Sequence, residues 1–259
     1  MPKVLDAYAL KARYYPALLA TIPALVALAI LISRVKFSLT TGIASLAIPV
    51  LVFAAADVAR RLGKRIENEI YAEMGGKPSV TMLRYTDNEF DVAAKEQYRA
   101  FLSSKVSQPV PTEEAENQNV KAGDAFYERA GAWLRENTRN TKKFGILFAE
   151  NVTYGYRRNL LGLKWPALVT NVVLVLLCTF VQYKKGAIDA DDETTIALMI
   201  VVALAVVHSL FMAFGVSRPS VVEASRTYAR QLILACETFL GKEKPVAPKA
   251  TPKLKAAKT

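Results

Sequence analysis

Four long apolar stretches without Asp, Glu, Lys or Arg dominate the pattern along the chain. They form two closely spaced pairs, residues 14–33 with 37–56 and residues 165–183 with 194–216. A helix of about 20 residues crosses a hydrocarbon core about 30 Å thick, and each stretch has about that length. The pattern therefore predicts four membrane-spanning helices arranged as two hairpins. The alternative is buried core helices in a soluble protein, but four uncharged runs of this length rarely occur together.

The polar residues between and after the two pairs also have helical patterns. Between the pairs we expect helices over 57–74, 87–106, 120–140 and 144–161, with a short extended piece over 78–85 and a linker over 107–118. After the second pair, Pro219 suits the first turn of a helix that runs to about Leu240. The last residues are rich in Pro, Ala and Lys and have too few apolar side chains to pack.

The predicted fold is a mainly α integral membrane protein, with two transmembrane helical hairpins flanking a mostly helical cytoplasmic domain. Its expected parts are an interfacial segment with the first hairpin (1–56), the cytoplasmic domain (57–164), the second hairpin (165–216), a cytoplasmic helix (217–241) and a disordered basic tail (242–259).

The placement of Lys and Arg sets the expected orientation. Four spans put both termini and the middle segment on one side, and that side holds all but four of the 34 Lys and Arg residues. Basic residues beside membrane spans stay in the cytoplasm, so we expect both termini and the central domain there. The middle segment has 18 basic and 15 acidic residues, which is a net charge of only +3 out of the total of +11. Membrane lipid, with its anionic headgroups, is therefore the simplest partner for the basic residues.

Motifs for catalysis are missing from the sequence. It has no nucleophile elbow, phosphate-binding loop, zinc-protease helix or dinucleotide fingerprint. The single histidine and the two cysteines offer no metal-ligand spacing, and we expect Cys178 and Cys236 to be reduced packing residues. The prediction is therefore no catalytic residue, no metal, no cofactor and no enzymatic activity.

Basic and aromatic residues are densest over residues 133–158, which carry a net charge of +4. Basic groups neutralise phosphates and aromatic rings stack on bases, so this mixture suits a nucleotide or a single strand. The alternative is a solvated helix face whose last arginines anchor the third span. With Arg84 from the extended piece, the candidate ligand-binding residues are Arg84, Arg135, Arg139, Lys142, Lys143, Tyr154, Tyr156, Arg157 and Arg158.

Polar residues also occur inside the second pair of apolar stretches. An ionisable group at that depth is a functional candidate, and His208 lies within the last stretch. Asn171, Cys178 and Gln182 are seven and four residues apart and therefore share a helix face. That face either lines water or holds helices together by hydrogen bonds. The candidate pore-lining residues are Asn171, Thr179, Gln182 and His208.

Three runs of residues carry a resemblance to a known family. They read LKARYYPALLATIPAL, GGKPSVTMLRY and AGAWLRENTRNTKKFGILFAENVTYGYRRNLLGLK. The chain up to about Leu163 resembles a family of uncharacterised bacterial four-span proteins. Through that family it is similar to the membrane effectors of anti-phage defence operons, such as the Hailong effector that is paired with a nucleotidyltransferase. The resemblance implies a channel of several subunits in the bacterial inner membrane, whose cytoplasmic domain senses a nucleotide or oligonucleotide.

Two functional hypotheses follow. The first is a homo-oligomeric pore in bacterial immunity, gated by a nucleotide or oligonucleotide bound to the cytoplasmic domain. The second is a non-conducting membrane scaffold or sensor that recruits a cytoplasmic partner protein, which the mixed charge of the central domain suits equally well. A transporter is a weaker reading, since the intramembrane charges expected for coupling are missing.

Overall fold

The computed structural model describes residues 7–33, 39–186, 188–189 and 191–243, without the side chains of residues 31, 33, 39–47, 242 and 243. The described part of the chain is mainly helical and contains no strand, so the prediction of a mainly α protein is confirmed. The elements in chain order are α1 (Ala7–Ala9), η1 (Leu10–Tyr14), α2 (Tyr15–Ser33), α3 (Leu39–Glu73), α4 (Pro78–Thr81), α5 (Val92–Val106), α6 (Glu113–Gln118), α7 (Val120–Asn137), α8 (Gly145–Lys185), α9 (Glu193–Leu210), η2 (Phe211–Gly215) and α10 (Arg218–Glu243). The short elements η1 and η2 are π-helical turns that continue directly into their neighbouring helices.

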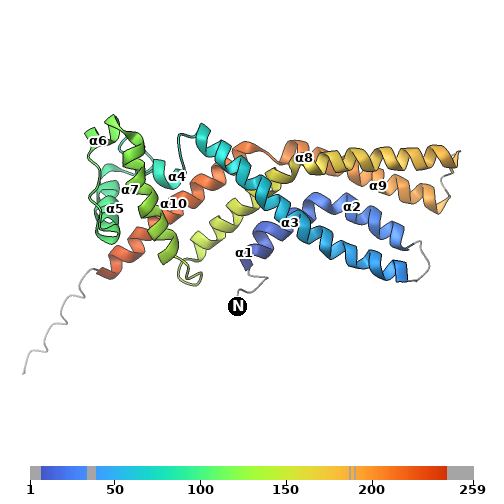
Figure 1. Cartoon of the computed structure of the whole chain (residues 1–259), viewed down its shortest axis with the longest axis horizontal. Helices are drawn as coiled ribbons and strands as arrows, with labels where there is room; N and C mark the ends of the chain where they lie inside the picture. The colour runs from blue at the N-terminus through green and yellow to red at the C-terminus, as the bar shows by residue number, and fades with distance from the viewer. Residues whose placement is uncertain (1–6, 34–38, 187, 190, 244–259) are drawn as a thin grey trace, which may run out of the picture.

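The helices form an elongated molecule, along most of which α8 runs (Figure 1). At one end α8 and α9 pack as an antiparallel pair, and α2 packs beside α3 as a second pair. At the other end, α4, α5, α6 and α7 gather around α10. The connection between α8 and α9 and the facing ends of α2 and α3 point toward the same end of the molecule.

Three helical segments among the described residues are long and apolar enough to cross a membrane. They are Ala7–Ile30, Gly145–Lys185 and Glu193–Gly215. These segments coincide with the first, third and fourth predicted spans. The second predicted span, residues 37–56, falls in the first half of α3 and lies partly outside the described residues.

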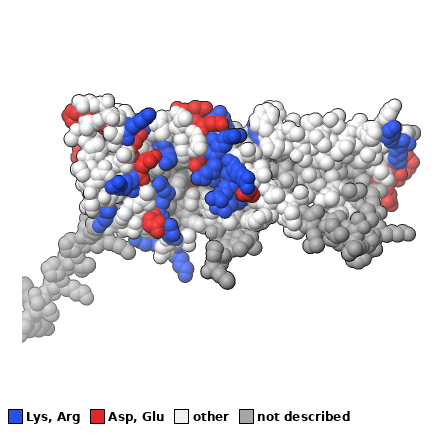
Figure 2. Space-filling view, in the orientation of Figure 1, with Lys and Arg blue, Asp and Glu red and all other residues white. Residues whose placement is uncertain are grey.

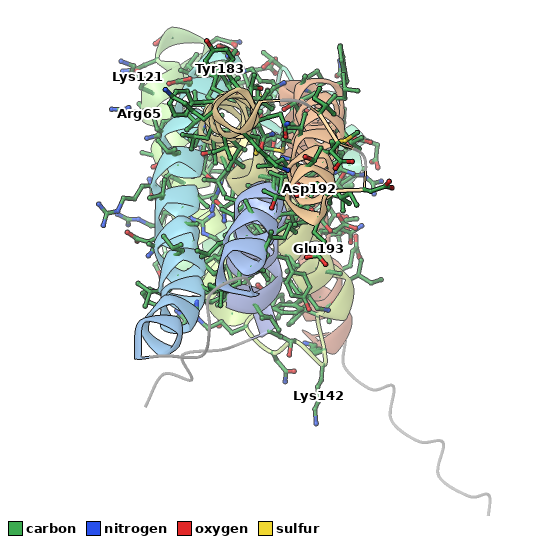
Figure 3. The ribbon with its side chains drawn as sticks, turned by 90° about the vertical axis from the view of Figure 1, so that its right-hand side faces the viewer. Arg65, Lys121, Lys142, Tyr183, Asp192 and Glu193 are labelled. Atoms are coloured by element: carbon green, nitrogen blue, oxygen red, sulfur yellow. The ribbon has the colours of Figure 1, made fainter. Side chains whose placement is uncertain are left out.

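The charges divide the surface into zones, as Figure 2 shows for one face. Charged residues of both signs are scattered over the half of the molecule that holds α4 to α7, and an uncharged zone follows over the apolar halves of α8 and α9. Charged residues return at the far tip, where Asp192 and Glu193 project toward the viewer in Figure 3. At this tip the Lys185 ammonium donates to Asp192, and Asp192 Oδ2 also accepts from Thr195 N at 2.7 Å. The first interaction ties the end of α8 to the start of α9, the second caps α9, and together they lower the pKa of Asp192 to about 2.

The segment after α3 differs from its prediction. Residues 78–85 do not form an extended piece: Pro78 opens the short helix α4, and turns follow it. No strand of the described chain pairs with these residues, and buried cations bind their carbonyl groups instead. Arg99 donates to the Leu83 carbonyl at 2.6 and 2.8 Å, and Lys95 Nζ donates to the Arg84 and Asp87 carbonyls at 3.1 and 2.5 Å.

Two further boundaries between α3 and α8 differ from their predictions. The helix expected from Asp87 begins only at Val92, because Asp91 is the residue whose side chain caps the Ala94 N–H. The expected linker 107–118 contains helix α6, which Thr112 caps. Its Glu116 is buried and accepts hydrogen bonds from Tyr127 and from the backbone of Tyr85. The carboxylate thus holds α6 against α7 and the turn after α4.

Helix α8 continues without a break through Pro166, so the expected helix 144–161 and the third predicted span are parts of one helix. A proline inside a helix removes one backbone hydrogen bond, and membrane helices tolerate this loss. At 41 residues, α8 is about 60 Å long. One continuous helix therefore joins the end of the molecule that holds α7 and α10 to its far tip.

Candidate functional site

The structure distributes the nine candidate ligand-binding residues over separate places. Arg84 lies in the turn after α4, where Nε and Nη2 donate to the Asp124 carboxylate at 2.8 and 2.7 Å. These hydrogen bonds raise the pKa of Arg84. Arg84 also donates to the Gly75 carbonyl at 2.8 Å, so it links α3, α4 and α7. Its guanidinium thus supports the fold of the domain.

Tyr154 and Arg158, one turn apart on α8, are buried at its crossing with α3. The Arg158 guanidinium donates to Glu67, and the Tyr154 hydroxyl donates to the same carboxylate at 2.6 Å. Tyr71, one turn after Glu67, places its hydroxyl 2.7 Å from that of Tyr154. The neighbouring Asn159 Nδ2 donates to a backbone carbonyl of η1 at 2.7 Å. We call this set the junction network: Glu67, Tyr71, Tyr154, Arg158 and Asn159.

The junction network binds η1, α3 and α8 together. The sequence prediction missed Glu67, Tyr71 and Asn159. The four-residue spacing shared by Glu67–Tyr71 and Tyr154–Arg158 is the signal that could have shown two matching polar helix faces. Because the Tyr154 ring is buried, it is not open for stacking on a base.

Arg157 and Tyr156 also lie at this crossing. Arg157 Nη1 donates to the Ser220 carbonyl at 3.0 Å and to Glu223 at 3.1 Å, which ties α8 to the start of α10. Tyr156 is half-buried and packs against the apolar cluster where α2, α3, α8 and α10 meet. Both residues therefore hold helices together in this structure.

Lys142 and Lys143 lie in the turn between α7 and α8. Lys142 is exposed and projects away from the body of the molecule (Figure 3). Lys143 places its ammonium over the rings of Phe144 and Phe239, 4.7 and 4.8 Å from their centroids. The exposed Lys142 can therefore reach a ligand more easily than Lys143, whose ammonium lies over two aromatic rings.

Arg135 and Arg139 line a pocket of about 210 Å³ beside this turn. We call it the α7–α8–α10 pocket, and its lining is Arg135, Thr138, Arg139, Thr141, Leu147, Phe148, Asn151 and Tyr228. Arg139 pairs with Glu136 at 2.5 Å on the exposed surface. The ring of Tyr228 stacks on that of Tyr154, with centroids 6.0 Å apart and planes 4° apart. The pocket is therefore in direct contact with the junction network.

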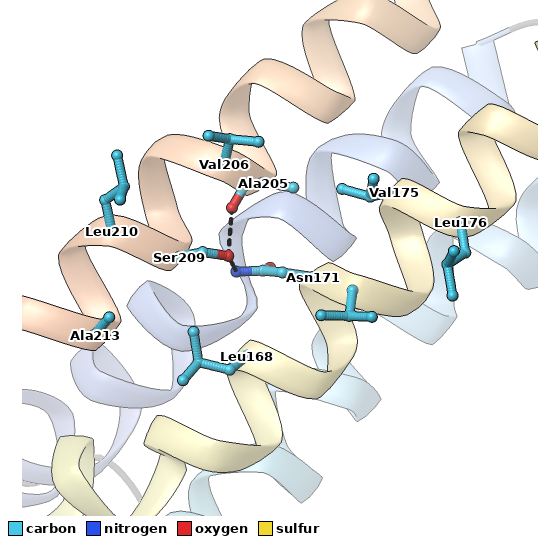
Figure 4. A pocket seen from close by; sticks show the side chains of 10 residues that line it. Leu168, Asn171, Val175, Leu176, Ala205, Val206, Ser209, Leu210 and Ala213 are labelled. Carbon is cyan, nitrogen blue, oxygen red and sulfur yellow. Dashed lines mark hydrogen bonds between the residues drawn. The ribbon is translucent and has the colours of Figure 1, made fainter.

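The intramembrane polar residues meet at the contact of α8 with α9 (Figure 4). Asn171 Nδ2 lies 3.0 Å from His208 Nδ1 and 2.9 Å from Ser209 Oγ, and Ser209 donates to the Ala205 carbonyl. Asn171 is 2 % exposed and His208 is 6 % exposed. The Asn171 amide therefore makes a buried polar contact with two residues of α9.

The other two candidate pore residues lie closer to the tip. Gln182 Oε1 accepts from the Thr195 hydroxyl at 3.3 Å, and the Thr179 hydroxyl donates to the Val175 carbonyl one turn earlier at 2.8 Å. Asn171, Cys178 and Gln182 do share a face, and that face packs on α9. Asn171 and Gln182 thus connect α8 to α9 by hydrogen bonds.

Among the described residues, no three His, Cys, Asp or Glu side chains are grouped to hold a metal ion. Comparison of the chain with known protein families, with curated proteins and with solved structures finds no match.

Proposed function

We propose that this chain is a homo-oligomeric membrane effector of bacterial anti-phage defence. A nucleotide or oligonucleotide from a partner nucleotidyltransferase binds to the cytoplasmic domain and thereby controls an ion-conducting pore. The observation that supports this proposal best is the continuity of α8. Its first turns line the α7–α8–α10 pocket, its middle carries the junction network, and its second half is one of the apolar segments. Any movement at the pocket end is therefore transmitted along one helix.

The first hairpin completes the proposed four-span arrangement in the inner membrane. Helix α3 packs antiparallel to α2, and the facing ends of both point to the tip where α8 meets α9 (Figure 1). If α2 crosses the membrane toward that tip, α3 returns through it over residues 39–56. Exposed Arg60, Arg61, Lys64 and Arg65 follow that stretch, as the positive-inside rule requires for a cytoplasmic end.

A pore requires several copies of the chain. Four helices are too few to enclose a channel, and Asn171 and His208 bond to each other inside one subunit. The exposed faces of α8 and α9 are apolar and include Val172, Leu176 and Val207, so they suit contact with lipid or with another copy.

The topology is tested by single cysteines in a chain whose native Cys178 and Cys236 are replaced by alanine. In intact spheroplasts, an impermeant maleimide is expected to label Lys36→Cys and Lys184→Cys, because both positions lie outside in the four-span arrangement. Lys142→Cys is the matched control and should react only after permeabilisation. Protection of Lys36→Cys beside a labelled Lys184→Cys would establish that α3 does not return through the membrane.

Ion conductance of the purified full chain in planar bilayers tests the function. Short oligoadenylates and cyclic dinucleotides serve as probes, added on the side of the cytoplasmic domain. We expect conductance that changes on addition from that side and stays constant on addition from the opposite side. If the bilayers show no conductance with any of these probes, the proposal of a pore is wrong.

A non-conducting scaffold that recruits a cytoplasmic partner is the second candidate. It is favoured by the burial of Asn171 and His208, which leaves few polar groups on the outer faces of α8 and α9. Silent bilayers together with nucleotide-dependent capture of one defined partner protein would make it the better proposal.

A further inference from the structure

The α7–α8–α10 pocket brings together hydrogen-bond donors that the fold leaves unused. Arg135 has no hydrogen bond or ion pair to any described residue, and the same holds for the side chains of Thr141 and Asn151. These three donors come from α7, from the turn after it and from α8. Groups of this kind, converging on one small space, can bind a single ligand from three sides.

The position of Arg135 is built into α7. Gly131 lies one turn earlier, and a Cβ atom there would be 3.3 Å from Arg135 Nη1. The missing side chain therefore leaves the space in which the guanidinium lies. Burial raises the pKa of the nearby Tyr228, and the positive charge of Arg135 opposes this rise, which shows that the two side chains are electrostatic neighbours.

The charge of the pocket selects for an anion. Its lining contains two arginines and no carboxylate. A guanidinium with unused N–H groups matches the oxygens of a phosphate in a bidentate geometry. Exposed Lys142 in the adjoining turn adds positive charge beside the opening.

The volume and the location of the pocket indicate which kind of molecule carries the phosphate group. At about 210 Å³ the pocket is below the usual range of about 300–1,000 Å³ for a whole organic ligand, so it accommodates one end of a ligand. Asn151 precedes Trp165 by 14 residues, or about 21 Å along the helix axis. Trp165 is 72 % exposed at the start of the apolar half of α8, where tryptophans mark the membrane interface. Lipid headgroups therefore lie too far away, and the ligand is soluble.

We propose that the α7–α8–α10 pocket binds a phosphate group of a soluble ligand, with Arg135 as its main contact. This inference rests on the proposed function and names the site at which the ligand acts. Because Tyr228 lines the pocket and stacks on Tyr154, a bound phosphate presses on the junction network and through it on α3 and α8.

Arg135→Gln and Arg129→Gln in the full chain test the site. Both arginines are exposed on α7, and Arg129 is the matched control because it lies outside the pocket. Detergent-solubilised protein is titrated with inorganic phosphate at constant ionic strength, and binding is followed by the rise in the unfolding midpoint. A labelled tetra-adenylate is then titrated into the same proteins. We expect Arg135→Gln to weaken both probes at least tenfold and Arg129→Gln to leave both nearly unchanged.

Equal effects of the two substitutions would contradict phosphate binding in the α7–α8–α10 pocket, because binding would then depend on the overall charge of the protein. If the wild type still bound tetra-adenylate in that case, the proposed function would stand with its ligand site elsewhere. Failure of the wild type to bind either probe would overturn both the pocket and a nucleotide-sensing function. Circular dichroism of Arg135→Gln confirms that its helices are intact.

Discussion

Glu67→Gln is expected to lower the free energy of unfolding by about 3–5 kcal/mol, because it leaves the Arg158 guanidinium buried without its partner. Arg158 and Glu67 are both largely buried, and the carboxylate also accepts from Tyr154 at 2.6 Å. The substitution keeps the shape of the side chain and removes its charge. Thermal unfolding in detergent measures the effect, and a loss of this size corresponds to about 6–20 °C in the midpoint.

Asp57→Asn on the same helix is the matched control. Asp57 pairs with Arg61 at 2.6 Å, but these side chains are 47 % and 78 % exposed. An exposed pair contributes about 0–1 kcal/mol, so the midpoint should hardly change. A double variant, Glu67→Leu with Arg158→Met, should recover much of the lost stability, since neither side chain then needs a partner. Equal losses in Glu67→Gln and Asp57→Asn would show that the junction network contributes nothing beyond a surface pair.

The same pair gives stability a definite pH dependence. Burial acts to raise the pKa of Glu67, but the hydrogen bond from Tyr154 and the charge of Arg158 outweigh it and hold the pKa below 4.5. A carboxyl group with a depressed pKa contributes its stability above its ordinary pKa and loses it as the pH falls through the folded-state value. The difference in midpoint between wild type and Glu67→Gln should therefore be constant above pH 5 and shrink below pH 4.

Gly162→Ala is expected to separate α3 from α8 and to cost about 3 kcal/mol, the upper part of the range for overpacking. A Cβ atom at position 162 would lie 2.6 Å from the Gly63 nitrogen and 3.0 Å from the Leu62 carbonyl carbon. These are backbone atoms, which cannot rotate away. The two facing glycines bring the helices close enough for Glu67 and Arg158 to meet.

Gly145→Ala, on the same helix, is the control for Gly162→Ala. A Cβ atom there meets nothing within 4 Å, and alanine is a better helix former by about 1 kcal/mol. We therefore expect an unchanged or slightly raised midpoint for Gly145→Ala and a clear loss for Gly162→Ala. Identical behaviour of the two variants would mean that α3 and α8 shift past each other at no cost.

The basic and aromatic residues at 133–158 are close in the sequence, but the structure places them in different surroundings. Arg135 and Arg139 line a pocket. Their neighbours Tyr154 and Arg158 are instead buried against α3. Tyr228, which joins the pocket to the junction network, lies far along the chain in α10, so no local pattern connects it to Arg135.

By itself the sequence determined the helical class and the position of three helices that are long and apolar enough to cross a membrane, because the length of an uncharged run is a local property of the sequence. It also determined that Asn171, Cys178 and Gln182 share one face, since helical periodicity is local as well. Only the tertiary structure decided which polar groups meet. Glu67 and Arg158 are 91 residues apart, and their contact depends on the rotation and crossing of two helices. The two helices cross this closely because their backbones meet at Gly63 and Gly162. The sequence around either glycine does not show that the two face each other.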